Sequence, residues 1–206
     1  NLPYVSQADL AVETGSTLTL LPGVVVKLSS ARSFIVRGAL SAAGTSSDPV
    51  VFTSLKDDAY GGDSQQDGPA SKPGPGDWGT IYFADTSDDS ASMLEQVLVR
   101  YGGASYNYGS GTATANLVLD SAAPAVRNSR FEMSAGYGVQ MLNVASPVFV
   151  GNQIGRSRNH GLWISPSSAP QVQTNMFLNN GGYAAYMTGS SQTVFNGNQA
   201  RDNRVN

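Results

Sequence analysis

The C-terminal half of the sequence repeats with a period of 23 residues, and this period restricts the possible folds more than any other feature. Pro124, Pro147 and Pro170 are each 23 residues apart, and Thr193 takes the next place. Each closes a short turn rich in serine and alanine. A fixed period of this length is typical of solenoids, in which each repeat packs only against its neighbours.

Apolar residues follow the same period and predict the columns that line the interior. The four columns are Val126, Phe149, Val172 and Phe195; Phe131, Ile154, Phe177 and Ala200; Val139, Leu162 and Ala185; and Val118, Met141, Ile164 and Met187. Within one period the apolar positions alternate, as in Val139 and Met141, which indicates strands rather than helices. We therefore expect three short strands per repeat, with consecutive repeats pairing in parallel about 4.8 Å apart.

A polar column, Ser129, Asn152, Asn175 and Asn198, keeps the same spacing. Asparagine tolerates left-handed backbone angles and can hydrogen-bond to its equivalents one repeat above and below. A stack of asparagines at a bend between strands resembles the asparagine ladder of the pectate-lyase-like β-helices. A leucine-rich repeat has a similar period, but its leucine scaffold is missing here.

The N-terminal half is less regular but compatible with the same coil. Residues 15–28, 38–45 and 49–54, and the segment Gly-Asp-Trp-Gly-Thr-Ile-Tyr-Phe at 76–83, resemble the opening rungs of β-helix domains in bacterial secreted and surface proteins. The resemblance covers nearly the whole chain. It implies an extracellular or cell-surface location and a domain that belongs to a larger protein with further domains.

These patterns together predict an all-β, single-domain, right-handed parallel β-helix with rungs of about 23 residues over residues 1–206. We expect irregular first rungs at 10–54, a polar insertion at 55–77, a second insertion at 104–115 and regular rungs at 116–206. The net charge of −3 provides no basic surface for nucleic acid. No segment approaches the roughly 18 apolar residues of a membrane helix, so we expect no membrane insertion.

The polar insertion is the candidate metal site. Asp63 and Asp67 flank Gln65 in Asp-Ser-Gln-Gln-Asp-Gly, which spaces oxygen ligands as the first half of a calcium loop does. A complete calcium loop would place Asp or Asn at position 65 and Glu at position 74, where this chain has Gln65 and Gly74. Asp57, Asp58 or Asp77 could complete a partial site, and our candidate ligands are Asp57, Asp63 and Asp67. The alternative is a solvated surface loop without calcium.

Catalytic groups are sparse in the regular rungs. Between residues 116 and 200 the only acidic residues are Asp120 and Glu132, in different phases of the repeat, whereas hydrolysis needs carboxylates clustered on one face. The single histidine, His160, lies at a predicted bend, and a lone surface histidine is more often structural than catalytic. We therefore expect a non-catalytic extracellular module that is structural, adhesive or polysaccharide-binding. The alternative is a polysaccharide lyase or hydrolase of the pectate-lyase-like superfamily.

An outward-facing column supplies the candidate binding residues. If Ile81 and Phe83 face inward, Tyr82 points outward, and we place one residue per rung in the same phase: Leu117, Gln140, Trp163 and Tyr186. Exposed aromatic rings suit the apolar faces of sugar rings, so Tyr82, Trp163 and Tyr186 are the candidate carbohydrate-binding residues, with a polysaccharide or cell-surface glycan as partner. Alternatively, a loop or another domain covers this face, or the rings only stabilise the sheet.

The second insertion contains two further aromatic residues, Tyr106 and Tyr108. Their rings could stack on sugars, or they could cover the side of the coil. The sequence leaves both alternatives open.

Overall fold

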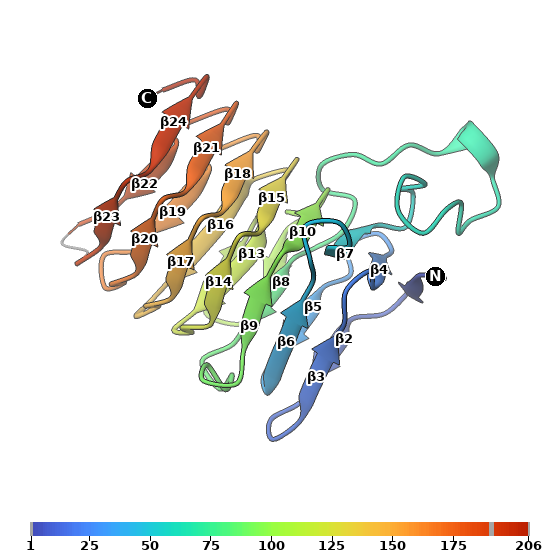
Figure 1. The fold of residues 1–206 in the computed structure, drawn as a ribbon, viewed down its shortest axis with the longest axis horizontal. Helices are drawn as coiled ribbons and strands as arrows, with labels where there is room; N and C mark the ends of the chain where they lie inside the picture. The colour runs from blue at the N-terminus through green and yellow to red at the C-terminus, as the bar shows by residue number, and fades with distance from the viewer. Residues whose placement is uncertain (1, 190–191, 206) are drawn as a thin grey trace.

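The computed structural model describes residues 2–189 and 192–205. The chain winds into a long coil of short strands (Figure 1). Successive turns stack in parallel and form three sheets that run along the coil, of eight, seven and seven strands among the described residues. The predicted parallel solenoid with rungs of about 23 residues is therefore confirmed. In the described part of the chain, no helix is long and apolar enough to cross a membrane.

Each turn of the coil contributes one strand to each of the three sheets. Sheet A contains β1 (Tyr4–Ser6), β4 (Val25–Leu28), β7 (Val50–Ser54), β10 (Val97–Arg100), β15 (Arg130–Glu132), β18 (Gln153–Gly155), β21 (Met176–Leu178) and β24 (Gln199–Arg201). Sheet B contains β2 (Leu10–Val12), β5 (Phe34–Val36), β8 (Ile81–Phe83), β13 (Ala115–Asp120), β16 (Tyr137–Leu142), β19 (Leu162–Ile164) and β22 (Ala185–Met187). Sheet C contains β3 (Thr17–Leu20), β6 (Ala39–Ala43), β9 (Met93–Glu95), β14 (Ala125–Arg127), β17 (Val148–Val150), β20 (Gln171–Gln173) and β23 (Val194–Asn196).

The interior consists of the predicted apolar columns. In sheet C, Val126, Phe149, Val172 and Phe195 pair in register across four rungs. In sheet A the column of Phe131 pairs in the same way, and the Phe131 and Phe149 rings stack with centroids 6.0 Å apart. All but the last members of these two columns are fully buried, and in the described part of the chain no further rung covers those last members.

One predicted column is wrong at its first member. The step from β13 to β16 spans 22 residues, so Leu119 pairs with Met141 and Leu117 pairs with Val139. A shift of one residue moves a side chain to the opposite face of a strand. Leu117 and Leu119 therefore belong to the core, and Val118 points outward instead of Leu117.

The predicted asparagine ladder forms at the bend between sheets C and A. The Oδ1 atom of Asn175 accepts hydrogen bonds from the backbone and side-chain amides of Asn152 at 2.8 and 3.0 Å, and Asn198 does the same for Asn175. The left-handed backbone angle falls on the residue before each ladder position, as at Thr174 with φ of 53°. The ladder residues are therefore selected for their hydrogen bonds rather than for a left-handed backbone.

A second ladder lies at the bend between sheets A and B. Asn203 Oδ1 accepts from the Asn180 backbone and side-chain amides, and Asn180 Oδ1 accepts from the Ser157 backbone amide. Ser157, Asn180 and Asn203 are also 23 residues apart, so the 23-residue period of the sequence could have predicted this second ladder. Two ladders fix the rung-to-rung register on both sides of sheet A.

Both polar insertions lie between strands and leave the core columns intact. The first occupies the connection from β7 to β8, includes the short 3-10 helix η1 (Gly68–Ala70), and projects away from the coil (Figure 1). The second contains an antiparallel hairpin of β11 (Tyr106–Asn107) and β12 (Thr112–Ala113). The hairpin leads directly into β13 and lies over the outer face of sheet B.

Candidate functional site

The outer face of sheet B carries five ring side chains in its C-terminal rungs, which we call the aromatic platform: Tyr137, His160, Trp163, Tyr183 and Tyr186. They form two columns. Tyr137, His160 and Tyr183 occupy equivalent positions where the chain enters sheet B, 23 residues apart. Trp163 and Tyr186 pair in register, three residues after His160 and Tyr183 along the chain. The parallel strands thus hold five rings on one side of the coil.

The rings of the platform contact one another. Ring centroids are 5.5 Å apart for Tyr137 and His160, 5.2 Å for His160 and Tyr183, and 5.6 Å for Tyr183 and Tyr186. Tyr137 also lies 6.5 Å from Trp163. Tyr183 and Tyr186 are each 40% exposed, and the other three rings are half-buried. The result is a solvent-accessible, mainly apolar surface with hydroxyl and N–H groups among the rings.

His160 lies at the centre of the platform. Its Nδ1 atom accepts a hydrogen bond from the backbone N–H of Tyr183 at 3.0 Å. The remaining proton of the neutral imidazole is therefore on Nε2. Burial lowers the pKa of His160 from its usual value of 6.5, which favours this neutral form.

The three predicted carbohydrate-binding residues do not form one site. Trp163 and Tyr186 lie in the platform, but Tyr82 lies further down the same outward row, separated from Trp163 by Val118 and Gln140. Tyr82 is only 7% exposed, because the hairpin of β11 and β12 covers it. It is therefore not accessible to a glycan in this structure.

Tyr82 makes specific contacts with the hairpin that covers it and with the coil. Its ring packs on Tyr106 and Tyr108, with centroids 5.1 and 5.9 Å away. Its hydroxyl donates to Asp120 at 2.5 Å, and burial together with this carboxylate raises the pKa of the phenol. Of the two alternatives for the second insertion, the structure has its tyrosines covering the side of the coil.

The acidic residues of the first insertion are distributed among separate interactions. Asp57 is buried, accepts from the Thr53 hydroxyl, and lies 3.8 Å from Nε of Arg100. Asp63 is exposed and caps its own turn by accepting the backbone amides of Gln65, Asp67 and Gly68. The Gly68 amide contributes most to lowering the pKa of Asp63. The side chain of Asp67 is exposed.

Lysine and arginine side chains supply positive charge to the same region. Lys27 is buried beneath the loop and donates to the carbonyl of Gly62, and burial lowers its pKa against the opposing effect of Asp58 and nearby carboxylates. Lys56 pairs with Asp77 at 3.0 Å. In residues 2–189 and 192–205, no three His, Asp or Glu side chains are grouped as metal ligands would be. Calcium binding stays a prediction, and calorimetry with millimolar calcium measures it.

Arg100 joins the loop to the coil. Its Nε lies 3.8 Å from Asp57 of the loop and 3.6 Å from Glu132 of β15, and its guanidinium stands 4.5 Å from the Tyr101 ring centroid. Both carboxylates are buried. Arg100 thus faces one buried carboxylate of the loop and one of the coil.

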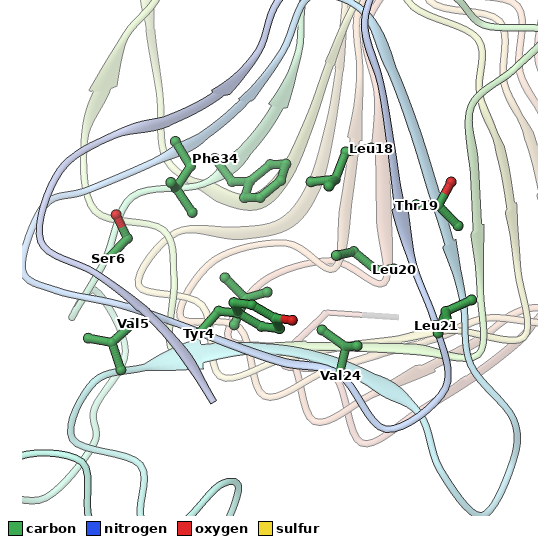
Figure 2. Close-up of a pocket in the computed structure, with 11 residues that line it drawn as sticks. Tyr4, Val5, Ser6, Leu18, Thr19, Leu20, Leu21, Val24 and Phe34 are labelled. Carbon is green, nitrogen blue, oxygen red and sulfur yellow. The ribbon is translucent and has the colours of Figure 1, made fainter. Parts of the chain in front are cut away.

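An apolar cavity of about 440 Å³ opens at the N-terminal end of the coil. Figure 2 shows Leu18, Leu20 and Phe34 turned toward the centre of this opening. The cavity continues the interior of the coil, and its lining contains hydroxyl groups but no charged side chain. Because the cavity has no charged side chain and continues the core, we place the candidate site on the aromatic platform.

The chain has the architecture of a parallel β-solenoid with a cluster of aromatic side chains on its outer surface. A family model described as "Right handed beta helix region" matches residues 97–206, which are 110 of the 206 residues. The chain therefore belongs to the right-handed β-helix family. No curated protein and no solved structure matched the chain in the corresponding comparisons.

Proposed function

We propose that the chain is a non-catalytic extracellular module that binds a polysaccharide or cell-surface glycan on its aromatic platform. The observation that carries the proposal is the pair of aromatic columns, which place five rings side by side over three rungs. Aromatic faces bury the apolar C–H faces of sugars without needing a charged partner. Hydroxyl groups at the ring edges are available to the sugar hydroxyls.

The dimensions of the platform suit an extended ligand. Three rungs at the spacing of parallel strands span on the order of 10 Å. The rings stand on a sheet whose register is fixed by the hydrogen-bonded strands and by the asparagine ladders. A ligand therefore meets rings whose relative positions are set before binding, which lowers the entropy cost of association.

The proposal favours binding over catalysis because of what the acidic residues contact. Asp57 and Glu132 share Arg100, and Asp120 accepts hydrogen bonds from Tyr82 and Asn143. These three carboxylates are engaged in contacts with residues outside the aromatic platform. The extracellular setting in the proposal is supported by the resemblance to secreted domains and by a charged content of 13%.

Titration with neutral and acidic oligosaccharides tests the proposal. Cellohexaose, xylohexaose, chitohexaose and hexagalacturonate would be titrated into the parent chain and into Trp163→Ala and Tyr186→Ala. We expect each substitution to weaken binding about tenfold, which corresponds to about 1.4 kcal/mol. Tyr4→Ala is the matched control, because Tyr4 is an exposed aromatic residue in the first rung, far from the platform. Equal affinity in the parent and both platform variants would refute the proposal.

A further inference from the structure

We propose that His160 positions the aromatic platform and makes its glycan binding depend on pH, with the neutral ring assembling the platform and protonation disrupting it. The proposal rests on the proposed function for its ligand, but the positioning role concerns the protein alone. It assigns a role to the only histidine of the chain.

The first argument is the position of the ring. His160 has Tyr137 on the rung below and Tyr183 on the rung above, and its centroid is also 5.0 Å from that of Tyr186. It therefore contacts three of the four other platform rings. A movement of this one ring changes the surroundings of most of the surface that would meet a sugar.

The second argument is the hydrogen bond at Nδ1. This atom accepts the Tyr183 backbone N–H at 3.0 Å, which only an unprotonated Nδ1 can do. In the imidazolium form Nδ1 carries a proton, so two donors would face each other. The ring must then turn away from the Tyr183 backbone, and the contacts to Tyr183 and Tyr186 change with it.

The third argument is the close fit of the ring against the next rung. A Cβ atom added to Gly182 would lie 2.2 Å from Nδ1 of His160, so the ring packs directly on backbone at that position. The protonated ring cannot relieve the clash of donors by moving toward Gly182. Its remaining path is outward, into the space in which a sugar would stack.

The charges around His160 give no compensation for an imidazolium. The ionisable groups on the strands and turns packed against it, or in its own turn, are phenols and guanidinium groups: Tyr137, Tyr183, Tyr186, Arg156, Arg158 and Arg204. Among the described residues of these turns, the one carboxylate is that of Asp202, which lies two rungs beyond Arg156 in the column of Arg156 and Asn179. Burial alone accounts for the lowered pKa of His160.

The sign of the pH dependence follows from these contacts. The pKa of His160 in the folded chain is below 6.5, so at neutral pH the ring is uncharged and the platform is assembled. As the pH falls through the folded-state pKa, the competent fraction falls with it. One pH unit below that pKa about a tenth of the molecules are competent, and the apparent affinity is about tenfold weaker.

The first experiment uses the ligand-free chain. The backbone amide resonance of Tyr183 is followed by ¹H–¹⁵N NMR between pH 8 and pH 4, in the parent chain and in His160→Gln. We expect the parent resonance to shift with the same midpoint as the His160 ring protons, and the variant resonance to stay constant, since glutamine offers an acceptor oxygen that does not titrate. A Tyr183 amide that ignores the titration of His160, or that shifts equally in the variant, overturns the positioning role.

The second experiment measures cellohexaose, xylohexaose and chitohexaose binding at the same pH values. We expect the parent chain to lose affinity about tenfold one unit below the His160 midpoint, and His160→Gln to bind with an affinity that does not change with pH. A parent affinity that is constant across the titration overturns the pH control. If neither these three glycans nor hexagalacturonate binds at pH 8, the proposed function fails, and the Tyr183 amide titration alone decides the positioning role.

Discussion

Replacing Asn175 by alanine removes the middle of the asparagine ladder and tests how much the ladder stabilises the coil. Asn175 is fully buried. Its Oδ1 accepts two hydrogen bonds from Asn152, and its Nδ2 donates to the Phe149 carbonyl at 2.9 Å and to Asn198 Oδ1 at 3.0 Å. The substitution leaves the polar groups of the neighbouring rungs in place but removes the partners that the Asn175 side chain gave them.

The expected loss follows from those orphaned groups. The backbone amide of Asn152 loses its acceptor, the side-chain amide of Asn152 keeps only the Val126 carbonyl, and the Phe149 carbonyl loses a donor, all in the buried interior. Each buried polar group left without a partner costs about 1–3 kcal/mol. Allowing for partial relaxation around the smaller side chain, we expect Asn175→Ala to lower the free energy of unfolding by about 3–5 kcal/mol.

Asn198→Ala is the matched comparison, because it removes the same chemistry from the end of the ladder. Asn198 is partly exposed, so water can replace its contacts to Asn175. We expect it to lower the free energy of unfolding by about 1 kcal/mol. Guanidinium denaturation followed by circular dichroism measures both variants, and hydrogen exchange separates loss of the last rung from global unfolding. A loss for Asn175→Ala no larger than that for Asn198→Ala would refute the reasoning.

Two further substitutions test the core and the attachment of the loop. Phe149→Ala should lower the free energy of unfolding by about 3–5 kcal/mol because the ring is fully buried, whereas Phe195→Ala should cost much less because that ring is 42% exposed; equal losses in denaturant titrations would contradict the column assignment. Arg100→Met should cost about 3 kcal/mol by removing the cation that buried Asp57 faces, while Glu132 keeps its 3.2 Å pair with Arg130, and should speed proteolysis within residues 55–77. Unchanged stability and cleavage would show that Arg100 does not hold the loop.

The interior of the coil could be predicted because each rung obeys the same spacing. Val126, Phe149 and Val172 repeat at 23 residues, alternate as strand residues do, and are all buried. Val118 was misplaced because the rung that follows the hairpin is one residue shorter, and a periodic pattern carries no information about the length of an irregular rung.

The outer surface was harder to predict because loops decide what is exposed there. The alternation of residues in the strand correctly predicts that Tyr82 points outward. The burial of Tyr82 depends on the hairpin of β11 and β12, and no repeat in the sequence predicts the conformation of that hairpin. Trp163 and Tyr186 were identified from their spacing. The column of Tyr137, His160 and Tyr183 has the same spacing, but it was not predicted from the sequence. These residues lie where the chain enters sheet B, at or before the start of each strand, where apolar and polar residues do not alternate.

Both insertions lie at connections between strands. The residues that cover the outer surface can therefore change without a change in the strands that form the core. Residues added at such a connection alter what shields the outer face of one rung, while the inward columns keep their register. The hairpin over Tyr82 shows how this works, because two short strands turn an outward aromatic residue from a contact surface into a buried one. Relatives that differ only in these connections could therefore present different binding surfaces on one unchanged framework.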